Sequence, residues 1–230
     1  MADSVHSGHR ARMRKRYLET GFTGFQPHEV LEMLLYYGIP RRDTNEIAHR
    51  LLERFGSLHD VLCAAPEALM QEPYISENAA VLITMFRSVL QYDAASKSVG
   101  VLLDSYAKVC KYFTDLYLFE EREVIRAALL DERLHVLRCE TVSEGHPTAA
   151  QMTVRQLTEL AYRANSNTII LAHNHPRGSA RLSGDDIAAT RHLVPILLQC
   201  GITLADHVVV CGETAISMRE QGVFMGLDIE

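Results

Sequence analysis

The stretch TIILAHNHPRGSARLSGDD, residues 168–186, predicts a strand, a loop and the start of a helix in direct succession. Its first five residues are apolar or β-branched, which is typical of a short buried strand ending at His173. The proline and the glycine that follow His175 break this pattern and predict a loop. From Ser183 onward, apolar residues recur at helical spacing to about Gln199, which predicts a helix.

The two histidines of this stretch stand at positions i and i+2. On a strand such residues point to the same face and lie about 6.6 Å apart along the chain, so both imidazoles can converge on one ion. A carboxylate in the first turn of the next helix can fold back as a third ligand. Asp185 and Asp186 both lie in that turn, and helix phase favours Asp186. Three protein ligands with an open fourth position are typical of catalytic zinc, and iron or manganese accept the same ligand types.

A simpler interpretation exists for Ser183 and Asp186. Ser-x-x-Asp before an apolar run resembles a helix capping box. Capping accounts for neither histidine, whereas a metal site accounts for all four residues in one local unit. The two roles are compatible, because one hydroxyl both donates and accepts a hydrogen bond.

The spacing of these residues resembles a known signature. His-x-His, seven further residues, Ser, two residues and Asp is similar to the motif of the JAMM (JAB/MPN) metallopeptidase domain, and the string from His173 to Gly178 resembles its RadC branch. The resemblance covers essentially the whole chain and is strongest over residues 120–222. It implies a JAMM/MPN, cytidine-deaminase-like mixed sheet flanked by helices and preceded by a small all-helical domain. It also implies a zinc-dependent hydrolase that cleaves peptide or isopeptide bonds in a peptide or protein substrate.

The resemblance further implies a role for each site residue. His173, His175 and Asp186 would be the metal ligands, and Ser183 would donate to a developing oxyanion or orient the water. For the general acid/base, the residues alone leave several carboxylates open: Glu120, Glu121, Glu123, Glu140 and Glu144. The resemblance selects Glu123, because it heads the family's Glu-Val…Leu-Leu-Asp strand.

Two further positions near the predicted site have open interpretations. Asn174 should point to the strand face opposite the histidines, which favours a structural hydrogen bond. Asp206 and His207 stand in a late apolar strand, where they either orient a ligand imidazole or form a structural pair at the strand end.

Composition narrows the class of protein. At 230 residues, 47% of them hydrophobic, the chain can bury a sizeable core in one or two domains. No apolar run approaches the roughly 20 residues of a membrane span, and the first residues carry no apolar targeting segment. Five scattered cysteines without a Cys-x-x-Cys pair indicate free thiols in a reducing compartment. We therefore expect a soluble, cytoplasmic protein with no membrane contact.

The chain has two parts with different patterns. Residues 1–95 carry only helical patterns, and residues 94–100 are small or polar, which predicts a linker. Residues 101–230 alternate between helix and strand patterns, which predicts an α/β or α+β domain around one sheet. The expected elements are helices over 105–118, 154–165 and 183–199, and strands over 123–130, 134–142, 168–173 and 203–211.

A nucleic-acid function is the alternative. Residues 54–69 resemble the helix-hairpin-helix region that precedes the RadC catalytic domain, and such hairpins bind phosphate through a glycine-rich turn. Here the turn, residues 72–77, lacks both glycines and is flanked by two carboxylates. The chain also has a net charge of −6, which argues against a general nucleic-acid binder. These features favour a structural or protein-docking role for the hairpin.

A basic cluster near the N-terminus is the remaining support for that alternative. It consists of Arg10, Arg12, Arg14, Lys15 and Arg16. Such a run is either a solvated helix face or a phosphate-binding patch. The cluster, the hairpin and the family name together suggest a nucleic-acid-associated DNA-repair accessory protein. A catalytically silent scaffold is a third interpretation, and the complete ligand set argues against it.

Overall fold

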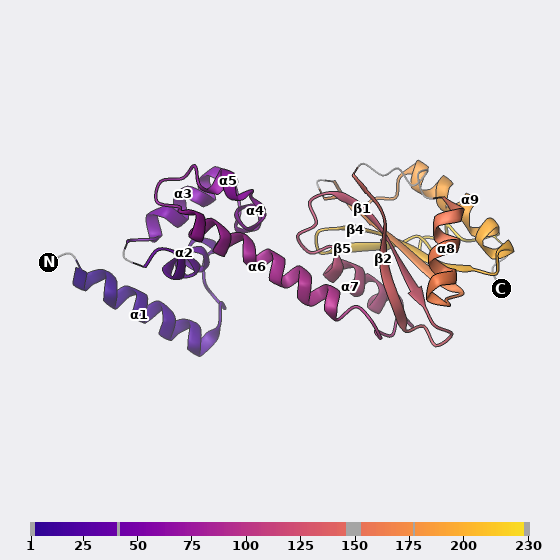
Figure 1. Ribbon diagram of the computed structural model, residues 1–230, viewed down its shortest axis with the longest axis horizontal. Helices are drawn as coiled ribbons and strands as arrows, with labels where there is room; N and C mark the ends of the chain where they lie inside the picture. The colour runs from indigo at the N-terminus through magenta and orange to yellow at the C-terminus, as the bar shows by residue number, and fades with distance from the viewer. Residues whose placement is uncertain (1–2, 41, 146–152, 177, 228–230) are drawn as a thin grey trace. The chain divides into compact units, whose positions relative to one another are not determined.

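The computed structural model describes residues 3–40, 42–145, 153–176 and 178–227. The chain divides into two compact units, Met1–Leu90 and Gln91–Glu230 (Figure 1). Among the described residues, no helix is both long and apolar enough to cross a membrane. The cytoplasmic location stays a prediction.

The first unit is helical, as the sequence predicts. Its helices are α1 (Asp3–Thr20), α2 (Pro27–Gly38), α3 (Asn45–Phe55), α4 (Leu58–Cys63), α5 (Pro66–Leu69) and α6 (Glu77–Ser96), the last of which crosses the division between the units. Apolar residues at helical spacing on α2, α3 and α6 form its core; Leu31, Leu35, Leu51 and Ile83 are fully buried there. Pro27 stands at the start of α2, and the Ser57 side chain caps α4.

Part of the basic cluster holds α1 against its own unit. The Arg10 guanidinium donates to the backbone oxygens of Pro40 (2.8 Å) and Ile39 (2.9 Å). Arg16 forms an ion pair of 3.0 Å with Glu29. These two side chains are therefore engaged in contacts within the unit, which leaves fewer of their N–H groups to donate to a phosphate.

The second unit is built around one mixed sheet. After α7 (Tyr106–Leu116) come β1 (Glu123–Leu130), β2 (Val136–Gly145), α8 (Val154–Ala164), β3 (Thr168–Asn174), α9 (Gly184–Gln199), β4 (Thr203–Cys211) and β5 (Thr214–Ser217). Within the described residues the strand order is β2-β1-β3-β4-β5. Only β3 and β4 run parallel in this sheet; the other described neighbours are antiparallel. This arrangement confirms the predicted mixed sheet flanked by helices.

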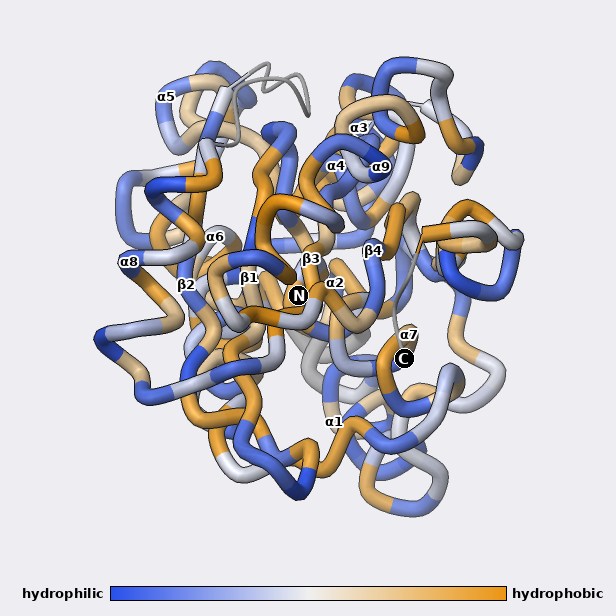
Figure 2. Tube along the Cα trace, turned by 90° about the vertical axis from the view of Figure 1, so that its right-hand side faces the viewer, coloured by the Kyte–Doolittle hydropathy of each residue, from blue (hydrophilic) through white to orange (hydrophobic). Residues whose placement is uncertain are grey.

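Helices cover both faces of the sheet. Apolar residues of α7 pack on one face together with Ala172 and Val208, and those of α8 and α9 pack on the other face with Leu171 and Val209 (Figure 1). Because both faces are covered, β3 is apolar at four consecutive positions, residues 169–172, rather than at alternate ones. Figure 2 colours the trace by the hydropathy of each residue. The central strands β3 and β4 are therefore held between two layers of helices, and they position the residues that follow their carboxyl ends.

The core against α7 provides a test of this packing. Phe113 is fully buried on α7, so we expect Phe113→Ala to lower the free energy of unfolding by about 3–5 kcal/mol through lost burial and a cavity. Denaturant unfolding measures this change. Tyr162→Ala is the matched control, because that ring is 88% exposed and its loss should cost within about 0.5 kcal/mol. Equal effects of the two substitutions would contradict the packing described here.

Three local features differ from the prediction. The second strand begins at Val136 rather than residue 134, because Leu134 adopts a left-handed conformation (φ 64°) in a turn closed by Asp131. Helix α6 continues to Ser96, so residues 94–96 of the expected linker are helical; an ion pair of 2.6 Å between Asp93 and Lys97 supports that last turn. The short strand β5 was not predicted.

Candidate metal centre

The two histidines lie at the end of the central strand β3. His173 pairs with Ile125 of β1 on one side and with Val209 of β4 on the other. The N–H of His175 donates to the backbone oxygen of Val210 (2.7 Å), which continues the strand pattern one residue beyond β3. Residues at i and i+2 therefore share a face here, as the sequence predicts.

The side chains of three predicted ligands come together. Among the described residues, His173, His175 and Asp186 form the one group of three or more such side chains that could hold a metal ion, with their ligand atoms within 4.8 Å of one another. The two Nε2 atoms are 3.1 Å apart, and Asp186 Oδ2 lies 3.5 Å from His173 Nε2. His173 and Asp186 are buried and His175 is half-buried.

This donor set fits zinc. Two imidazole nitrogens and one carboxylate oxygen are common zinc ligands, and bond lengths near 2.0–2.1 Å with tetrahedral angles place neighbouring ligand atoms about 3.3 Å apart. The observed separations of 3.1 and 3.5 Å bracket that value. The structure thus shows a site that could bind a metal.

Ser183 is the N-cap of α9. Its hydroxyl oxygen accepts the backbone N–H of Asp186 (3.0 Å), and its hydroxyl hydrogen is donated to Asp186 Oδ2. Both halves of the predicted capping box are therefore present. The cap also fixes the Asp186 carboxylate beside the histidines, whereas Asp185 is exposed and lies outside the cluster.

The electrostatics of the cluster favour a positive charge. Burial raises the pKa of Asp186, but hydrogen bonds from His173, when protonated, and from Ser183 outweigh burial and hold the pKa well below its usual range. The carboxylate is therefore ionised at neutral pH. A cation in the space beside His173 Nε2 would be stabilised by this charge.

Glu123 begins β1 on the same face of the sheet as the histidines. In the antiparallel pair β1/β3, Ile125 lies opposite His173, so Glu123, two residues earlier, falls on the His173 side. Glu123 and His175 both line a cleft of about 760 Å³, together with Gly145, Pro176 and Gly178. The cleft is the space through which a substrate could approach the cluster.

The other carboxylates considered from the sequence are placed differently. Glu120 forms an ion pair of 3.5 Å with Arg126. Glu144 pairs with Val124, whose side chain points to the α7 face, and Glu121 lines the same cleft as Glu123. Glu123 therefore stays the predicted acid/base, with Glu121 as its nearest competitor.

Asn174 has the structural role predicted for it. Its side-chain oxygen accepts the backbone N–H of Val124 (2.8 Å), and its Nδ2 donates to the backbone oxygen of Arg122 (2.8 Å). The two contacts hold the residues on either side of Glu123. Asn174 thus fixes where β1 begins relative to the histidines.

The structure separates the roles of Asp206 and His207. The Asp206 carboxylate accepts the backbone N–H groups of His207 (2.7 Å) and Arg219 (3.0 Å), which is a structural role. His207 instead places its Nε2 2.9 Å from His173 Nδ1 and its Nδ1 2.6 Å from Thr190 Oγ1. Burial lowers the pKa of His207 well below its usual value, and repulsion from His173 adds to the shift. Its ring is therefore neutral at neutral pH.

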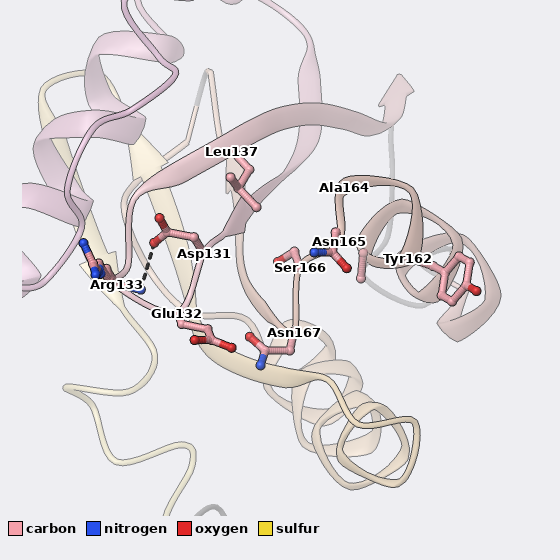
Figure 3. A pocket seen from close by; sticks show the side chains of 10 residues that line it. Asp131, Glu132, Arg133, Leu137, Tyr162, Ala164, Asn165, Ser166 and Asn167 are labelled. Atoms are coloured by element: carbon pink, nitrogen blue, oxygen red, sulfur yellow. Dashed lines mark hydrogen bonds between the residues drawn. The ribbon is translucent and has the colours of Figure 1, made fainter.

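A larger cavity lies elsewhere. It has a volume of about 850 Å³ and is lined by Asp131, Glu132, Arg133 and residues 164–167, among others (Figure 3). These residues stand at the opposite ends of β1 and β3 from the histidines. The described lining contains no histidine or cysteine, and Figure 3 shows Asp131 engaged in its own turn. The smaller cleft, by contrast, is lined by His175 of the cluster.

Fold and site together define the second unit as a mixed α/β domain with a candidate metal centre at the end of its central strand. Residues 103–223 match the RadC-like JAB domain, so the chain belongs to that family. The match includes α7, all five strands described above and the three clustered side chains. This confirms the resemblance that the His-x-His stretch carries.

Proposed function

We propose that the protein is a zinc-dependent metallohydrolase of the JAMM type that cleaves peptide or isopeptide bonds. The observation that carries this proposal is the convergence of His173, His175 and Asp186 beside a cleft that Glu123 also lines. Membership of the RadC-like JAB family supports the same reaction class.

Each residue has a distinct role in this proposal. His173, His175 and Asp186 hold the zinc ion, which when bound supplies Lewis acidity towards a carbonyl oxygen and lowers the pKa of a water molecule. The Glu123 carboxylate takes the proton of the attacking water and then gives it to the leaving amine. A single carboxylate can do both in sequence, provided that it stays within hydrogen-bond reach of the reacting atoms.

Ser183 has a double role in the proposal. Its hydroxyl hydrogen points to Asp186 in the structure, and turning it towards a developing oxyanion would stabilise the transition state. We expect Ser183→Ala to lower kcat by about 10²–10³-fold, the cost of losing an oxyanion donor. Steady-state kinetics measures this loss, and Ser183→Thr, which keeps a hydroxyl, should recover most of the activity. Unchanged turnover in Ser183→Ala would restrict Ser183 to its capping role.

The proposed reaction is tested by removing and restoring the metal. Chelator-treated protein should hydrolyse neither fluorogenic peptides nor lysine-linked isopeptides, and added zinc should restore cleavage of one of these classes. Whichever class is cleaved identifies the bond. Cleavage that persists without metal, in protein verified to be zinc-free, would contradict the proposal.

The nucleic-acid alternative has weaker support. Arg12 and Arg14 are exposed on α1, whereas Arg10 and Arg16 bond within their own unit. In the hairpin, the carboxylate of Glu72 pairs with Arg54 (2.9 Å). We therefore expect DNA binding that is weak and loses little affinity between 50 and 200 mM salt, because few phosphate contacts give a shallow salt dependence. A steep loss in a gel-shift titration would revive the alternative.

A further inference from the structure

We propose that His207 and Thr190 form a hydrogen-bond relay that fixes which nitrogen of His173 carries its hydrogen, and so presents the bare Nε2 atom of His173 to the metal. This inference rests on the proposed metal site, but the relay consists of contacts within the protein alone. It assigns a positioning role to two buried residues, one on β4 and one on α9.

The relay begins on α9. Thr190 Oγ1 lies 2.7 Å from the backbone oxygen of Asp186, one turn earlier. The hydroxyl has one hydrogen, and in the proposed relay it is directed to this carbonyl oxygen, which can only accept, whereas the nearby ring nitrogen can donate; the sulfur of Met218 is a weaker acceptor at 3.3 Å. The same Thr190 oxygen lies 2.6 Å from His207 Nδ1. In this arrangement the Thr190 oxygen accepts from the ring, and Nδ1 of His207 carries the hydrogen.

His207 in turn determines which nitrogen of His173 carries hydrogen. It is fully buried, and a neutral ring that is protonated at Nδ1 has a lone pair at Nε2. That Nε2 atom lies 2.9 Å from His173 Nδ1, which must therefore be the donor. The result is a His173 ring with hydrogen at Nδ1 and a lone pair at Nε2.

His175 reaches the same state by a separate contact. Its Nδ1 lies 3.3 Å from the backbone oxygen of Ser179, an atom that can only accept. Both Nε2 atoms then carry lone pairs, 3.1 Å apart and close to the Asp186 carboxylate. Three electron-rich atoms at this separation repel one another unless a cation lies between them. The relay therefore prepares the site for metal rather than for a neutral hydrogen-bonded cluster.

Asp186 links the relay to the metal through two different groups. Its side chain belongs to the cluster, and its backbone oxygen receives the Thr190 hydrogen that sets the relay. The first turn of α9 thus provides one ligand and determines the orientation of another. Partners of this kind typically change metal affinity by roughly 10–100-fold when they are removed.

The tautomers can be measured without metal. Long-range ¹H–¹⁵N correlation spectra of chelator-treated wild-type protein distinguish hydrogen at Nδ1 from hydrogen at Nε2 for each histidine. We expect hydrogen at Nδ1 in both His173 and His207. Hydrogen at Nε2 of His173 as the main form would overturn the relay, whether or not the protein binds zinc or cleaves a substrate.

Substitution tests the consequence for metal binding. His207→Phe keeps a planar ring and removes the acceptor, so the zinc Kd from chelator competition should rise by roughly 10–100-fold. His207→Gln offers a side-chain oxygen to His173 Nδ1 and should recover most of the affinity. Val208→Ala is the matched control, because Val208 is the next residue but packs on the α7 face, and its Kd should equal that of the wild type.

Two outcomes of this series would count against the relay. Wild-type affinity in a folded His207→Phe protein would show that the hydrogen bond does not matter, and equal loss in the Phe and Gln variants would show that only packing does. Circular dichroism and thermal unfolding establish that each variant is folded. Failure of the wild type itself to bind zinc would instead overturn the proposed function, and the apo spectra would still decide the relay.

Discussion

Replacing His173 with alanine should reduce the zinc content of the purified protein from stoichiometric to background. The Nε2 atom of His173 lies close to both other ligand atoms, at 3.1 Å from His175 Nε2 and 3.5 Å from Asp186 Oδ2. Without it, only two of the three protein ligands remain, and they do not complete a catalytic zinc site. Elemental analysis after dialysis against a low concentration of zinc measures the change.

His192→Ala is the control for this first prediction. His192 is an exposed histidine on α9 outside the cluster, so its removal should leave the zinc content unchanged. Stoichiometric zinc in His173→Ala, or an equal loss in both variants, would place the metal elsewhere or show that the binding is nonspecific.

The second large effect concerns Glu123. Glu123→Gln keeps the size of the side chain but removes its ability to take and return a proton, so kcat should fall by about 10²–10⁴-fold. Zinc should stay bound, because Glu123 lies outside the cluster of possible ligands. Turnover of the substrate class identified by the metal-restoration assay, measured together with zinc content, tests both statements.

Two control variants make this test specific. Glu144→Gln changes an exposed carboxylate on β2 that pairs with Val124 rather than facing the histidines, and it should retain activity. Glu121→Gln changes the other carboxylate of the cleft and should have a much smaller effect than Glu123→Gln. If Glu121→Gln is the inactive variant and Glu123→Gln turns over normally, the general acid/base role passes to Glu121.

Local sequence patterns were sufficient for much of the fold. Residues 168–172 predict a buried strand because nearly every position is apolar. The structure contains that strand as β3, which is covered on both faces. Ser183 and Asp186 predict a cap, which the start of α9 contains. The interactions of the cap lie within one turn of the chain, so the order of residues alone specifies them.

The rest depends on tertiary contacts. Leu134 begins the pattern that predicts the second strand, yet the turn closed by Asp131 places it at φ 64°, and β2 begins two residues later. Thr190 looks like an ordinary position on an apolar helix, and only the packing of α9 on β4 brings it to His207. The spacing of four residues between Asp186 and Thr190 is the one local sign of that contact, and it does not indicate a partner.

The candidate site, too, is predicted partly by local patterns and depends partly on tertiary contacts. The His-x-His spacing predicts that His173 and His175 converge, because strand geometry is regular. The choice of Glu123 among several carboxylates instead depends on the register of β1 against β3, which Asn174 fixes through residues on either side of it. Register between distant strands is not encoded in local periodicity, so here the family resemblance supplied what the pattern could not.

Anomalous diffraction at the zinc edge, from crystals grown with stoichiometric zinc, tests the central claim most directly. We predict a single strong peak within bonding distance of Nε2 of His173, Nε2 of His175 and the carboxylate of Asp186. A peak at another position, or none at a concentration that saturates the protein in solution, would contradict the account.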